Sequence, residues 1–113
     1  MASAAVPVVV APGKIVGETI PGLESATSAH LAAAGPGIVF DLSRVAFISS
    51  EGLGWFVKIG KRLGDQGRRI ALAAPAKSVD RLFRVVGLDA VLPLFRTVGE
   101  ASDHVVRAGP SAA

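Results

Sequence analysis

The strongest constraint on the fold is one segment in which an apolar strand runs through a short turn into a helix start that carries two serines. The segment spans residues 39–54 and reads VFDLSRVAFISSEGLG. Ser49 and Ser50 precede a helix whose first turn is rich in glycine, where free backbone N–H groups favour an anion. A serine there either caps the helix or can carry a phosphate. Either of the two can be the cap while the other faces solvent.

Strand and helix patterns alternate along the rest of the chain. Strands are predicted at residues 6–10 and 14–16 (interrupted around Pro12-Gly13), 38–40, 69–73 and 91–95, and helices at 20–31, 51–63, 79–86 and 98–107. Pro93 cannot donate to a strand ladder, so the last strand is expected at an edge. The pattern predicts an α/β fold, a small sheet with helices packed against it.

Two helical faces can be assigned from spacing. The predicted buried stripe of the helix at 51–63 is Leu53, Phe56, Val57, Gly60 and Leu63, and that of the last helix is Val98, Ala101, Val105 and Val106. Trp55 falls off the first stripe, and Ile59 follows it by one turn, flanked by Lys58 and Arg62. This half-apolar, half-basic strip is typical of a contact surface. The alternative is a tryptophan folded onto its own helix or covered by a neighbouring segment.

Composition excludes several classes of function. The chain of 113 residues has a net charge of +3 and no cysteine, so disulfides and thiolate chemistry are excluded. Basic runs do not exceed two residues, which argues against a nucleic-acid face. No signal peptide is recognised and no apolar run approaches the roughly 20 residues that span a bilayer, so we expect no membrane insertion and a cytoplasmic location. We expect one domain over residues 1–113, with a core at about 6–107 and short flexible tails.

No catalytic chemistry is indicated. His30 and His104 are isolated from other metal-ligand residues, which argues against a metal site. Phosphate-binding, dinucleotide-binding and serine-hydrolase motifs are absent. We therefore expect a protein that is not an enzyme and uses no cofactor.

Several motifs resemble one known family. They are Asp41-Leu42, Phe47-Ile48-Ser49-Ser50, Gly52-Leu53-Gly54, Leu82-Phe83 with Gly87-Leu88, and Gly13-Lys14-Ile15. In this order they resemble the STAS domain and, within it, the bacterial anti-sigma factor antagonists. The resemblance covers roughly residues 6–107. It implies a STAS-type small mixed β-sheet with about four α-helices packed against it.

The resemblance also implies a site and its partners. Ser50 matches the serine that a cognate kinase phosphorylates, Ser49 stands where the family has aspartate, and Glu51 replaces a second hydroxyl. Val16 stands where the family often has an acidic residue. The implied partners are an anti-sigma factor that is also a serine kinase, and a phosphatase, with the protein a monomer or weak dimer. The predicted partner-binding residues are Ser49, Ser50, Glu51, Gly52, Trp55, Lys58, Ile59 and Arg62.

Two alternatives stay open. Glu51 can simply stabilise the first helical turn, or it can supply some of the negative charge of a phosphate and select a more basic partner. The chain can also be a constitutive STAS subunit of a membrane lipid-transport ATPase complex, in which the same helix start docks permanently and no phosphate is needed.

Overall fold

The computed structural model describes residues 6–107, and the predicted flexible tails at 1–5 and 108–113 lie outside the described residues. The elements are β1 (Val8–Val10), β2 (Lys14–Ile15), α1 (Ile20–Ala32), β3 (Gly37–Asp41), β4 (Phe47–Ile48), α2 (Ser50–Asp65), β5 (Arg69–Ala73), α3 (Lys77–Val85), the 3-10 turn η1 (Leu88–Ala90), β6 (Leu94–Phe95) and α4 (Val98–Arg107). This alternation of strands and helices confirms the α/β class.

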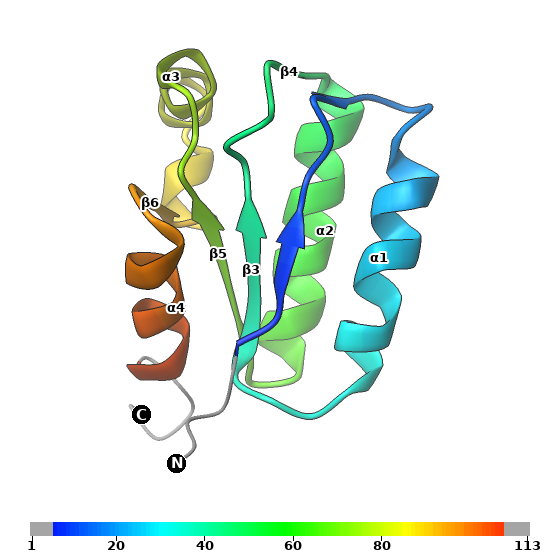
Figure 1. Ribbon diagram of the computed structural model, residues 1–113, viewed down its shortest axis with the longest axis vertical. Coiled ribbons are helices and arrows are strands. Elements are labelled where there is room, and N and C mark those ends of the chain that lie inside the picture. Colours follow the sequence, from blue (N-terminus) through cyan, green and yellow to red (C-terminus); the bar gives the residue numbers. More distant parts are fainter. Residues whose placement is uncertain (1–5, 108–113) are drawn as a thin grey trace.

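The central sheet has the strand order β1-β3-β5-β6, and β2 and β4 form a separate pair. The resemblance implied a mixed sheet; in residues 6–107 every strand pair is parallel. A helix connects each strand of the central sheet to the next, because neighbouring parallel strands cannot be joined by a tight turn. Figure 1 shows the resulting layers, with α1 and α2 on one side of the sheet and α4 on the other.

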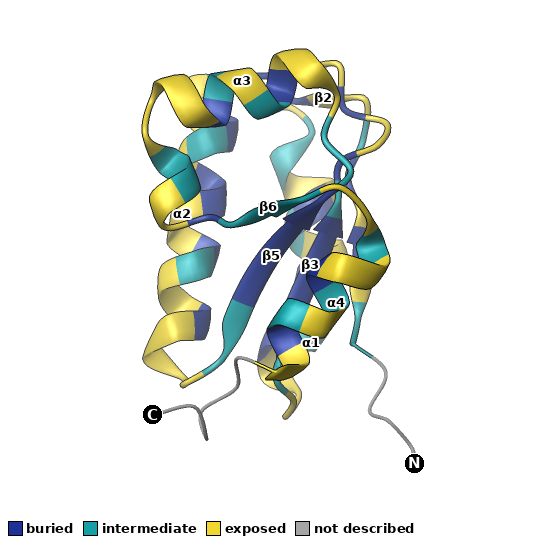
Figure 2. Ribbon diagram, turned by 90° about the vertical axis from the view of Figure 1, so that its left-hand side faces the viewer, coloured by how far each residue is buried: buried dark blue, intermediate teal, exposed yellow. Residues whose placement is uncertain are grey.

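Two apolar cores lie on the two faces of the sheet. The larger one packs the sheet against α1, α2 and α3, and the smaller one packs it against α4. Strand β3 contributes to both, because Ile38 and Phe40 point into the larger core and Val39 into the smaller. All three residues are completely buried, as their continuous apolar run predicted, and β3 and β5 are mostly dark blue in Figure 2.

The buried face of α2 differs from the predicted stripe. Its buried residues are Gly52, Trp55, Phe56, Ile59 and Leu63. The prediction was right for Phe56 and Leu63, but Val57 is 37% exposed and Trp55 lies in the core. The Trp55 ring packs edge-on against Phe40 and Phe56, with ring centroids 5.6 Å and 5.2 Å apart. The helix is therefore rotated toward its aromatic side, where the larger apolar surface is buried.

The C-terminal part departs from the prediction in two places. The last strand begins at Leu94 instead of residue 91, because η1 and the turn that follows it take up the preceding residues. It occupies the sheet edge that Pro93 predicted. On α4, Ala101 and Val105 are buried as expected, whereas Val106 is 50% exposed. Residue 106 lies about 100° around the helix from residue 105 and so turns away from the sheet.

Candidate functional site

Ser49 is the residue that caps α2. Its backbone is extended, and its Oγ accepts a hydrogen bond from the Gly52 N–H at 3.1 Å. The same hydroxyl donates to the carbonyl oxygen of Ile15 at 3.2 Å, and the Ser49 N–H donates to that oxygen at 2.9 Å. Ser49 therefore satisfies the helix start and ties it to β2.

Ser50 is the first residue of α2 and is exposed. Its hydroxyl forms no hydrogen bond with any residue between positions 6 and 107. Of the two arrangements that the sequence left open, the structure has Ser49 as the cap and Ser50 facing solvent. A group added to the Ser50 oxygen would therefore leave the cap in place.

Gly52 allows the helix start to approach the β2–β4 pair closely. A Cβ at this position would lie 2.8 Å from the Ile15 Cγ2, the Ile15 carbonyl oxygen and the Ile48 Cγ1. Contacts that short with backbone and core atoms cannot be relieved by a small side-chain movement. Gly52 is buried, so its predicted contact with a partner is replaced by a packing role.

An open hollow of about 660 Å³ lies beside the helix start, here called the β4 hollow. It is lined by Lys14, Val16, Gly17, Glu18, Phe47 and Glu51. Phe47 is 53% exposed. Figure 1 shows the β2–α1 turn, β4 and the start of α2 at the same end of the molecule. Sequence reasoning missed Phe47 as a site residue, although its place before the buried Ile48 in a strand puts it on the opposite face.

The residues of the predicted strip on α2 are not all exposed in the structure. Trp55 and Ile59 are 4% and 0% exposed, so neither is available to a partner, and that part of the prediction is wrong. The indole N–H of Trp55 donates a hydrogen bond to the Glu24 carboxylate on α1, which satisfies its polar atom in the core. The alternative of a tryptophan covered by a neighbouring segment is the correct one. Lys58 and Arg62 are exposed, as predicted.

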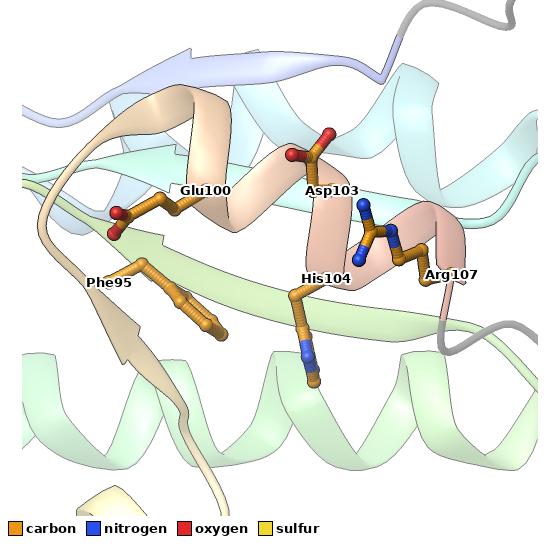
Figure 3. A pocket seen from close by; sticks show the side chains of 5 residues that line it. All are labelled: Phe95, Glu100, Asp103, His104 and Arg107. Carbon is orange, nitrogen blue, oxygen red and sulfur yellow. The ribbon is translucent and has the colours of Figure 1, made fainter.

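A second hollow, of about 510 Å³, lies between β6 and α4 and is lined by Phe95, Glu100, Asp103, His104 and Arg107. Figure 3 shows Phe95 and His104 extending into the same space. The centroids of the two rings are 4.9 Å apart, and the ring planes are inclined to each other by 36°. Burial, and then the charge of Arg69, lower the pKa of His104 below its ordinary value.

Within residues 6–107, no group of three or more histidine, cysteine, aspartate or glutamate side chains is arranged to hold a metal ion. The same residues include no helix that is both long enough and apolar enough to cross a bilayer. The helix start of α2 offers the exposed Ser50 hydroxyl on a capped backbone, next to an open, partly apolar hollow that Glu51 lines.

Comparison with known proteins agrees with the resemblance. The model of the STAS domain family matches residues 3–101. A Thermotoga maritima protein named as a candidate anti-sigma factor antagonist is 35% identical over 66 residues. The chain spans about 58% of the length of that relative and 60% of a similarly named one from Thermotoga neapolitana.

Two solved structures share the fold. The crystal structure of an anti-sigma factor antagonist from Mycobacterium paratuberculosis matches with a TM-score of 0.77 at 33% identity, covering 88% of this chain and 84% of that one. The structure of the anti-sigma factor antagonist SpoIIAA in its unphosphorylated form matches with a TM-score of 0.72 at 23% identity, covering 95% and 94%. With a family match that covers most of its length, the chain belongs to the STAS domain family.

Proposed function

We propose that this protein is an anti-sigma factor antagonist that acts in the cytoplasm by binding, not by catalysis. Its partner is an anti-sigma factor that is also a serine kinase, and the contact is made by the start of α2. The kinase, with its own ATP and Mg²⁺, phosphorylates Ser50 and so ends the interaction, and a phosphatase reverses the modification. The relatives named as anti-sigma factor antagonists support this proposal.

The observation that carries the proposal is that the two serines have different structural roles. Ser49 holds the helix cap, while the exposed Ser50 hydroxyl makes no contact that phosphorylation would break. A phosphate adds about −1.5 to −2 charges. The N-terminus of α2 tolerates such a charge, and favourable placement there contributes about 0.3–1 kcal/mol. The modified protein therefore stays folded.

Phosphorylation has a different effect on the complex with the anti-sigma factor. An unmatched charge in an interface carries a desolvation cost of several kcal/mol. Glu51 follows Ser50 directly and is exposed, so the phosphate would join a negative charge already present. Phosphorylation would therefore weaken binding while the fold of the antagonist is unchanged, which is what a reversible switch requires.

The test is a titration of the anti-sigma factor kinase encoded nearest to this gene with the wild type, Ser50→Ala and Ser50→Asp. We expect Ser50→Ala to bind like the wild type and Ser50→Asp to bind at least tenfold more weakly. Ser78→Asp is the matched control, because Ser78 is also an exposed serine in a first helical turn, that of α3. Equal affinities of all four proteins would remove Ser50 from the switch.

Mass spectrometry after incubation with the kinase and ATP tests the modification itself. We expect phosphate on Ser50 in the wild type and none on Ser50→Ala. Stable co-purification with a permease and an ATPase, with Ser50 unmodified, would instead support the constitutive subunit of a lipid-transport complex.

A further inference from the structure

The β4 hollow beside the start of α2 is lined in part by apolar side chains. Strand alternation buries Ile48 and turns Phe47 outward, where about half of the residue is exposed. Val16, which also lines the hollow, is half-buried. A phenylalanine left this exposed beside a candidate contact site is the kind of residue that dominates binding energy when a partner covers it.

The walls of this hollow are held in place before any partner arrives. The Thr19 hydroxyl accepts a hydrogen bond from the Val16 N–H at 3.0 Å and donates to the Lys14 carbonyl oxygen at 2.7 Å. On the other side, Ser49 is bonded to Ile15 through both its N–H and its hydroxyl. A partner would therefore bind a preformed surface and lose little free energy in ordering it.

The lining of the hollow also carries charged side chains and is, on balance, acidic. Lys14 contributes one positive charge, and Glu18 and Glu51 contribute two negative ones. The Glu51 carboxylate lies close to Gly17, since a Cβ built on that glycine would be 2.8 Å from the Glu51 Oε1. Protein–protein contacts usually combine apolar side chains with charged groups in this way.

We propose that the β4 hollow receives an apolar side chain of the anti-sigma factor, with a neighbouring lysine or arginine of that partner pairing with Glu51. This inference rests on the proposed function and adds the chemistry of the partner segment. It gives Glu51 a role in selecting a basic partner. One partner cation matches the charge of Glu51 but not the further charge of about −1.5 to −2 that a phosphate next to it would add, which is compatible with release on phosphorylation.

The first test compares Phe47→Ala with Val85→Ala in titrations against the same anti-sigma factor kinase. Val85 is the matched control, because it is an exposed apolar residue, 76% accessible, on α3. We expect Phe47→Ala to weaken binding about 30-fold or more, as a central aromatic contact does, and Val85→Ala to leave affinity unchanged. Circular dichroism confirms that both variants are folded.

The second test addresses the basic neighbour. Glu51→Gln is expected to weaken binding and to reduce its salt dependence, because a charge pair is lost. Gly17→Ala keeps the charge but displaces the carboxylate, and it should weaken binding less.

The outcomes separate this inference from the proposed function. If Ser50→Asp abolishes binding while Phe47→Ala and Val85→Ala bind alike, the switch stands and the docking of an apolar side chain is wrong. Unchanged affinity and unchanged salt dependence in Glu51→Gln would overturn the proposed pairing of Glu51 with a lysine or arginine of the partner. A wild type that does not bind the anti-sigma factor overturns both proposals together.

Discussion

Helix α2 has two regions with opposite properties, its exposed tip and its buried stripe. The tip consists of Ser50 and Glu51, which face solvent above the cap that Ser49 provides. The large buried side chains of the stripe begin one turn later with Trp55, and Ile59 is buried as well. Figure 2 shows yellow, teal and dark blue segments alternating along α2.

The contrast separates binding from stability within a single element. Modification of the tip does not disturb the core, because the hydrogen bond that caps the helix is made by Ser49. The stripe packs against β5 and the aromatic residue Phe40 of β3, so it contributes to folding. Changes at the tip should alter affinity, and changes in the stripe should alter the free energy of unfolding.

The largest effect is expected in the stripe. Trp55→Ala should lower the free energy of unfolding by about 3–5 kcal/mol, because it removes a buried aromatic side chain that packs on two phenyl rings. Urea denaturation followed by circular dichroism measures it. Trp55→Phe is the milder control, since it keeps an aromatic ring and loses the bond to Glu24. If Trp55→Ala left the free energy of unfolding unchanged but weakened partner binding, Trp55 would belong to the interface after all.

Local sequence predicted the order of the elements better than the orientation of α2. The bounds of β5 and α4 match the predicted ranges, because turn residues punctuate the chain there. The face of α2 was ambiguous, since apolar residues occur on several sides of it: Leu53, Trp55, Phe56, Val57 and Ile59. Which of them are buried depends on contacts with strands distant in sequence, and those contacts favoured the aromatic pair.

The choice between two serines is a similar case. Both are acceptable caps by residue type. Ser49 takes the role in the structure, where its hydroxyl and N–H also bond to Ile15, 34 positions earlier in the chain. A contact over that sequence separation cannot be predicted from the local residue pattern. The resemblance predicted Ser50 as the modified serine, but only the fold shows which of the two hydroxyls caps the helix.

An intermediate effect is expected at the cap, at the boundary between the two regions of α2. Ser49→Ala should lower the free energy of unfolding by about 0.5–2 kcal/mol, because the Gly52 N–H loses its acceptor. Ser50→Ala is the matched control and should stay within about 0.5 kcal/mol of the wild type, as surface changes usually do. Thermal and urea unfolding of the two variants provide the comparison. A larger loss for Ser50→Ala would show that the caps have been assigned to the wrong serines.

The smallest effect is expected on α4, away from both regions of α2. Burial and Arg69 lower the pKa of His104 in the folded protein, so the unfolded chain binds this proton more readily. The stabilising contribution is present above the unfolded pKa of about 6.5 and is lost as pH falls through the lower folded pKa. The free energy of unfolding should therefore decrease on acidification from about pH 7.5 to 5.5, by less than the limit of about 1.4 kcal/mol per pH unit for one proton. His104→Gln should flatten this dependence, and Arg69→Gln, which removes the second cause, should reduce it partly. Urea unfolding at several pH values measures the slope, and a slope unchanged in His104→Gln would assign the acid sensitivity to other groups.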